Sequence, residues 1–130
     1  MESRAHDWLV QAEDDYAWAE DTRTHNRYAQ CCFVCQQVAE KAMKALALFS
    51  GFESVRGHSV FEICQSLGIG GDVETSAKRL DLYYVSARYP DAFPTGSPFQ
   101  FFTPEQADEA LTFAGTILKF VKKKMDDNDQ

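Results

Sequence analysis

The chain has 130 residues, the size of one ordinary domain, which leaves no room for a multidomain enzyme. Hydrophobic residues make up 45% of it and charged residues 25%, so the composition is typical of a globular protein and excludes an intrinsically disordered one. The chain carries 13 Lys and Arg against 20 Asp and Glu, and this net charge of -7 argues against general coating of DNA.

The first predicted helix runs from Arg4 to about Asp21, because apolar or small residues recur there at spacings of three and four. These residues are Ala5, Trp8, Leu9, Ala12, Tyr16 and Ala19. The opposite side of the helix is acidic and is expected to be solvated surface. Its acidic residues are Glu13, Asp14, Asp15, Glu20 and Asp21.

The second helix is predicted from Arg27 to Ser50, with an apolar stripe that alternates spacings of four and three. The stripe consists of Tyr28, Cys32, Cys35, Ala39, Ala42, Leu46 and Phe49. A second apolar row widens the buried arc and leaves a narrow polar strip of Gln37, Glu40, Lys41 and Lys44. We therefore expect this helix in the middle of a bundle.

A short third helix is predicted from His58 to Leu67, and a fourth from Asp72 to about Arg88, where Pro90 ends it. The stretch from Tyr89 to Phe102 holds three of the four prolines, so it is predicted to be a stiff, irregular loop. Its aromatic residues are expected to pin it to the bundle. They are Phe93, Phe99, Phe101 and Phe102.

The sequence from Thr103 to Gln106 is a capping box with proline at the first helical position, which predicts the start of the last helix. This helix is expected to continue to Lys124 and Met125, and the residues from Asp126 to Gln130 are expected to be a frayed tail. No run has the alternation of a β-strand. The predicted fold is all-α: residues 1–130 form a single domain, an up-and-down antiparallel helical bundle of four long helices and one short helix.

The N-terminal residues carry no basic stretch followed by an apolar one, and no apolar run approaches the roughly 18 residues that cross a bilayer. We therefore expect a cytoplasmic protein without a membrane segment. Cysteines Cys31, Cys32 and Cys35 lie too close together for an ordinary disulfide framework, with Cys64 further along. Core packing of the cysteines is favoured over a zinc site, and no metal is expected.

Charged side chains on central helices require partners. Glu40 and Lys44 form a pair four residues apart, and Asp81 and Arg88 are predicted to share one face of the fourth helix. One interpretation is that these groups form a buried ion-pair network. The other is functional: they line a cleft for a phosphate-bearing ligand or form a subunit interface. The sequence contains no P-loop and no hydrolase elbow, so no residue is assigned as catalytic.

Three stretches resemble the HEPN domain (higher eukaryotes and prokaryotes nucleotide-binding) in their order and spacing. They are Gln36 to Ala45, Gly57 to Ser59, and Arg88 to Ala92. The motif positions within them are Gln37, Glu40, Lys41, Lys44, His58, Arg88, Tyr89, Pro90 and Asp91. The resemblance covers nearly the whole chain and identifies it as a member of the small prokaryotic type.

The resemblance implies an all-α bundle that commonly forms homodimers and is often encoded beside a minimal nucleotidyltransferase of a toxin-antitoxin pair. Some family members are metal-independent ribonucleases, whose signature is an Arg followed after four to six residues by a His. Here the eligible positions after Arg88 are Phe93, Pro94 and Thr95, so the signature is absent. Its loss removes the group that would transfer the proton.

The leading hypothesis is a homodimeric module that binds a nucleotide, ATP or GTP, or a nucleotidyltransferase partner, with no required cofactor. Arg88 is the predicted phosphate ligand, assisted by Lys41, Lys44 and Asp91; alternatively, Arg88 pairs with Asp81 or Asp91 and fixes the loop. Two further hypotheses remain. In the first, which is less favoured, the protein is an RNA-cleaving toxin with a variant site around Arg88 and with His58 as its base. In the second, it is a dimerisation module without a ligand.

Overall fold

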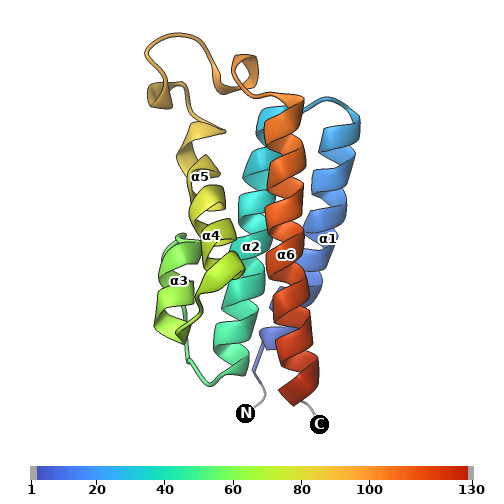
Figure 1. Cartoon of the computed structure of the whole chain (residues 1–130), viewed down its shortest axis with the longest axis vertical. Helices are drawn as coiled ribbons and strands as arrows, with labels where there is room; N and C mark the ends of the chain where they lie inside the picture. The colour runs from blue at the N-terminus through green and yellow to red at the C-terminus, as the bar shows by residue number, and fades with distance from the viewer. Residues whose placement is uncertain (1–2, 129–130) are drawn as a thin grey trace.

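The computed structural model describes residues 3–128, and every regular element among them is helical (Figure 1). The α-helices are α1 Ala5–Thr24, α2 Tyr28–Phe49, α3 Val60–Leu67, α4 Gly71–Asp81, α5 Tyr83–Ser86 and α6 Pro104–Asn128. Two short 3-10 turns, η1 Pro90–Ala92 and η2 Pro98–Gln100, lie in the long connection before α6. The all-α prediction is confirmed.

The long helices form an up-and-down bundle. In Figure 1, α1 and α4 ascend while α2 and α6 descend, so neighbours along the chain are antiparallel. Helix α2 packs against α1, α3, α4, α5 and α6, which confirms its predicted central place. The short helix α3 lies beside α4 and α2.

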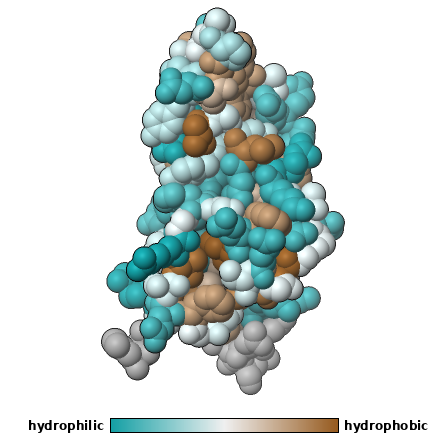
Figure 2. Space-filling model, turned by 90° about the vertical axis from the view of Figure 1, so that its left-hand side faces the viewer, coloured by the Kyte–Doolittle hydropathy of each residue, from teal (hydrophilic) through white to brown (hydrophobic). Residues whose placement is uncertain are grey.

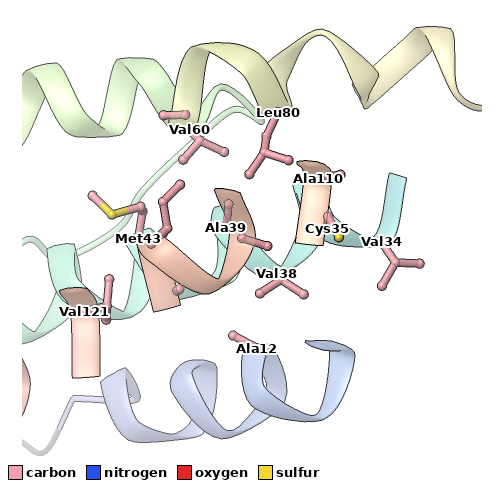
Figure 3. Packing of buried hydrophobic residues seen from close by; sticks show 14 of the residues in the cluster. Ala12, Val34, Cys35, Val38, Ala39, Met43, Val60, Leu80, Ala110 and Val121 are labelled. Carbon is pink, nitrogen blue, oxygen red and sulfur yellow. The ribbon is translucent and has the colours of Figure 1, made fainter. Parts of the chain in front are cut away.

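The core where α1, α2 and α6 meet is built mostly from small side chains. Ala12, Ala39 and Ala110 are fully buried, one on each of these helices (Figure 3). Small residues at such positions let helices approach closely, and larger side chains such as Met43 and Ile117 fill the remaining space.

All four cysteines are buried in this core, as predicted. Burial disfavours the thiolate, so it raises the pKa of Cys32 to about 12 and that of Cys64 to about 11. Within the part of the chain that is described, no group of His, Cys, Asp or Glu is arranged to hold a metal ion.

The start of α6 has the predicted capping box. The backbone nitrogen of Gln106 donates to Thr103 Oγ1 at 3.2 Å, and that of Thr103 donates to Gln106 Oε1 at 2.9 Å. The two residues thus satisfy each other's backbone donors at the helix end.

Four predicted boundaries were wrong. The third helix begins at Val60 rather than at His58, because the Ser59 side chain caps it by accepting from the backbone nitrogen of Glu62. Helix α1 continues to Thr24, since the hydroxyls of Thr22 and Thr24 bond back to carbonyls of the preceding turn. The fourth predicted helix is divided into α4 and α5 at Leu82, whose φ of -60° and ψ of -23° are closer to a 3-10 turn. Helix α6 extends through Asn128 because Met125 is fully buried and anchors its last turn, and residues 129–130 of the predicted tail lie outside the described residues.

Only part of the aromatic loop is pinned to the bundle. Phe102 is buried and Phe93 is half-buried against the core, as predicted. Phe99 and Phe101 are instead 68% and 47% exposed, although Phe101 stacks on Phe93 at 4.9 Å. No helix among residues 3–128 is both long and apolar enough to cross a membrane.

Candidate functional site

A buried carboxylate, Glu40, lies at the centre of the polar strip of α2. Its side chain is only 7% exposed. Lys44 donates to Oε2 at 2.9 Å, and His58 Nδ1 lies 3.2 Å from Oε1. The predicted pair between Glu40 and Lys44 is confirmed, and the carboxylate binds a third charged or ionisable group from outside the helix.

The spacing of α2 explains how His58 is held. Gln36 and Glu40 are four residues apart, so both face the segment that precedes α3. Gln36 Nε2 donates to the backbone carbonyl of His58 at 2.9 Å, while Glu40 contacts the ring. His58 is therefore fixed by both its main chain and its side chain, although the side chain remains 56% exposed.

The start of α3 is held by Asp81. Its carboxylate accepts hydrogen bonds from the backbone nitrogens of Val60 and Phe61 at 2.9 and 3.0 Å and from the Ser59 hydroxyl at 2.9 Å. These bonds satisfy free donors at the N-terminal end of the helix. Asp81 thus fixes α3 beside α4.

Asp15 was wrongly assigned to the solvated face of α1. It is 6% exposed and forms an ion pair with Lys41 of α2. Its place follows from helical spacing, because Asp15 lies three residues after Ala12 and four before Ala19, both on the buried side. Lys41 therefore joins α1 to α2 through a mostly desolvated pair.

The guanidinium of Arg88 rests on aromatic rings. Its Cζ atom lies 4.3 Å from the centroid of Phe33, 4.5 Å from that of Tyr84 and 4.8 Å from that of Tyr89. Arg88 Nε donates to the backbone carbonyl of Tyr84 at 2.8 Å. The rings and this bond hold the cation in one position.

Arg88 forms no ion pair with a carboxylate in the described range. The alternative in which it pairs with Asp81 or Asp91 is wrong: Asp81 binds the start of α3, and Asp91 is exposed on η1. A cation that is fixed by rings rather than by an acid keeps its charge available to an external anion.

Tyr84 connects Arg88 with His58. The imidazole of His58 stacks on the Tyr84 ring at 4.5 Å, the same distance at which Arg88 approaches it. A hollow of about 230 Å³ opens beside them; it is lined by His58, Ser59, Asp81, Leu82, Tyr84 and Val85. His58 and Arg88 thus contact the same ring, and only His58 of the two lines the hollow.

The other predicted ligands are not at this surface. Lys41 pairs with Asp15 on α1, and Lys44 lies 5.7 Å from the ring of Trp8, also on α1. Of the predicted ligands, Arg88 therefore lies near α5, Asp91 is exposed on η1, and the two lysines lie near α1.

Two residues of the site were missed in the sequence. Tyr84 lies four residues before Arg88, so helical spacing alone could have indicated it. Phe33 comes from α2 and meets Arg88 only through tertiary packing, so no local pattern indicated it.

A row of exposed apolar side chains borders the hollow. Leu82, Val85 and Tyr89 follow one another at spacings of three and four and are 67%, 50% and 50% exposed. Figure 2 shows apolar patches between hydrophilic areas on the side of the molecule that carries α3, α4 and α5. Such a row next to a fixed cation is typical of an interaction surface.

Comparison with known proteins places this arrangement in a family. The HEPN domain profile matches residues 5–124. The chain belongs to the HEPN domain family. This HEPN protein is also 27% identical over 128 aligned positions to the protein named "Putative toxin MJ1304" of Methanocaldococcus jannaschii, with 88% of this chain and 84% of that protein covered.

Solved structures are similar to this HEPN protein in both sequence and fold. TT1696 from Thermus thermophilus is 38% identical and has a TM-score of 0.89, with 95% of this chain and 99% of that chain covered. ST0689, an archaeal HEPN homologue, is 37% identical with a TM-score of 0.83, over 96% and 99% of the two chains. The HEPN domain protein TM0613 of Thermotoga maritima is 29% identical with a TM-score of 0.74, over 93% and 98%.

Proposed function

We propose that this HEPN protein binds a nucleotide through Arg88 and acts in a two-component toxin-antitoxin pair. The observation that carries the proposal is the Arg88 guanidinium, which is held on three aromatic rings without a carboxylate partner in the described part of the chain. The similarity to a protein named as a toxin supports the assignment to such a pair.

The chemistry around Arg88 suits a nucleotide. A guanidinium binds phosphate through parallel hydrogen bonds, and exposed aromatic rings bind bases by stacking. Tyr89 is 50% exposed beside the cation, and His58 stacks on Tyr84, which Arg88 also contacts. Lys41 and Lys44 are less suitable than His58 as auxiliaries, because they lie toward α1 and away from Arg88.

We also propose that two copies pair through the row of Leu82, Val85 and Tyr89. The row is exposed and apolar, and it borders the hollow beside His58. Pairing there would remove apolar surface from water and would bring two Arg88 sites together. Replacing Val85 with Glu should then yield a monomer in sedimentation experiments, whereas Val10→Glu on α1 should not.

Titration of ATP and GTP by calorimetry tests nucleotide binding. Arg88→Ala is expected to weaken binding about tenfold or more, because a charge-assisted contact to phosphate is lost. Arg79→Ala is the matched control: this arginine lies on α4 and already binds Glu109 at 3.0 Å, so its loss should leave affinity unchanged. An unchanged affinity in Arg88→Ala, or no binding by the original protein, would exclude the proposal.

The partner is proposed to be a nucleotidyltransferase, which the resemblance of the three stretches to the HEPN domain implies. Purification of the tagged protein from its native cells, followed by mass spectrometry, should recover such an enzyme in stoichiometric amount. Recovery of the bait with RNA fragments and no second protein would instead favour the second candidate below.

RNA cleavage is the second candidate function, favoured by the position of His58. Its Nδ1 contacts the buried carboxylate of Glu40, and its ring stacks on Tyr84 beside Arg88. An imidazole oriented by a carboxylate can transfer protons, and the arginine can stabilise phosphate charge. Cleavage of RNA in the presence of EDTA, abolished by His58→Ala and by Arg88→Ala, is the expected result; equal activity of His58→Ala would exclude this role.

A further inference from the structure

A second hollow lies apart from the Arg88 surface. It has a volume of about 830 Å³ and forms where the start of α1, the end of α2 and the loop after α2 meet. Figure 1 shows this region at the end of the bundle that carries both termini, whereas α5 lies toward the other end. Its lining residues are Ser3, Arg4, Trp8, Lys44, Leu48, Phe52, Glu53, Ser54 and Val55.

The walls of this hollow are largely apolar. Trp8 and Phe52 contribute aromatic rings that are 36% and 41% exposed, and Leu48 and Val55 are half-buried beside them. Apolar rings that residues 3–128 leave partly exposed favour a ligand with an apolar or planar body.

Two cations, Arg4 and Lys44, line the hollow, and Lys44 is the buried one. The Lys44 side chain is 11% exposed, and its Nζ lies 5.7 Å from the Trp8 ring. An ammonium has three N–H donors, yet within residues 3–128 the only hydrogen bond of this Nζ is to Glu40 Oε2. The remaining donors, in a mostly desolvated position, favour an acceptor that carries negative charge.

The rim limits how much negative charge the ligand can carry. Arg4 is bound to Asp7, and Glu53 adds an acidic group to the lining. Lys44 already forms an ion pair with Glu40, and the whole chain has a net charge of -7. A triphosphate would therefore meet more repulsion than attraction here, whereas one carboxylate would match the free donors of one ammonium.

We propose that this hollow binds a small amphipathic monocarboxylate, with its carboxylate on Lys44 and its apolar body against Trp8 and Phe52. The proposal is independent of Arg88 and of nucleotide binding. In this proposal Lys44 binds a carboxylate, whereas the sequence predicted that it assists Arg88 in binding a phosphate.

Fluorescence of Trp8 provides the readout. The chain has two tryptophans, and Trp18 is 55% exposed, so Trp18→Phe leaves Trp8 as the only reporter at little structural cost. The probes are benzoate, phenylacetate and 4-phenylbutyrate, each compared with its neutral amide. A saturable change is expected for at least one acid, with its amide binding about tenfold more weakly.

Two variants separate the parts of the site. Lys44→Met should weaken binding of the acid about tenfold and make acid and amide equivalent. Val55→Phe, which keeps Lys44 and adds no second tryptophan, should weaken binding of both by occupying part of the hollow. Circular dichroism confirms that each variant is folded, and Arg88→Ala should bind the acid unchanged.

Several results would overturn the proposal. They are equal affinity for acid and amide in the original protein, unchanged binding in folded Val55→Phe, and no saturable change with any of the three acids at millimolar concentration. Loss of binding in Arg88→Ala would show that the probes occupy the other surface. Failure of nucleotide binding in the earlier titration would leave this proposal unaffected.

Discussion

The cations on the two sides of α2 are held in opposite ways. Toward α1, Lys41 and Lys44 form ion pairs with the buried carboxylates of Asp15 and Glu40. Toward α5, Arg88 rests on aromatic rings and forms no ion pair with any described acid. The lysines neutralise charges that the fold has buried, whereas the charge of Arg88 is balanced by nothing in the described chain.

The difference separates stability from binding. A desolvated ion pair is costly to break, because its remaining member is left buried and uncompensated. A half-exposed cation on rings contributes little to stability and remains accessible to an anion. The following predictions test this contrast, beginning with the largest expected effect.

Replacing Glu40 with Gln should destabilise the protein most. The carboxylate is 7% exposed and Lys44 is 11% exposed, so the change leaves a buried ammonium without its counter-charge. We expect the free energy of unfolding to fall by about 3 to 5 kcal/mol. Urea unfolding followed by circular dichroism measures it.

The double variant Glu40→Gln with Lys44→Met is the control for this effect. Removing both charges should restore the free energy of unfolding to within about 1 kcal/mol of the original value. A cost below about 1 kcal/mol for Glu40→Gln alone would show that the pair is better solvated than its burial indicates.

Asp15→Ala should have a smaller effect. Lys41 is 26% exposed, so its ammonium can reach water once the carboxylate is gone. We expect a loss of about 1 to 2 kcal/mol in urea unfolding. Asp14→Ala, at an exposed position on the same helix, should change stability by less than about 0.5 kcal/mol. Equal effects of the two variants would place Asp15 on the solvated face after all.

Arg88→Ala should change stability by only about 1 kcal/mol, because it loses cation-aromatic contacts and one hydrogen bond to a carbonyl. The loss in the free energy of nucleotide binding should exceed the loss in the free energy of unfolding. If urea unfolding instead shows a loss as large as that of Glu40→Gln, Arg88 is a structural residue and the contrast fails.

The smallest effect is expected for the exposed pair of Arg23 and Asp108. A hydrogen bond from Arg23 lowers the pKa of Asp108 below its ordinary 3.8. A lowered pKa contributes stability that is present above the ordinary value and is lost as the pH falls through the lowered one. The unfolding midpoint of Arg23→Gln should therefore lie slightly below that of the original protein at pH 7 and coincide with it in stronger acid.

The parts that were predicted from the sequence depend on local patterns. The stripe of α2 and the capping box of α6 follow from helical spacing and from backbone donors that need partners. Asp15 follows the same helical spacing as the buried Ala12 and Ala19, so periodicity alone predicts that it is buried. It was assigned to the solvated face because of its charge.

The surface around Arg88 could not be predicted in this way. Phe33 and Arg88 are far apart in the sequence and meet only because α5 packs against α2. The contact between His58 and Glu40 likewise depends on how the loop before α3 crosses α2. Such pairings depend on tertiary packing, which hydrophobic periodicity does not specify.

The carboxylate of Glu40 has one oxygen toward Lys44 and the other toward His58. Lys44, which lines the hollow beside Trp8, and His58, which lines the hollow beside Tyr84, therefore contact the same carboxylate. A ligand that draws Lys44 away from Glu40 changes the counter-charge available to His58, and the reverse holds equally. By thermodynamic linkage, the factor by which either ligand alters the affinity of the other must be the same in both directions.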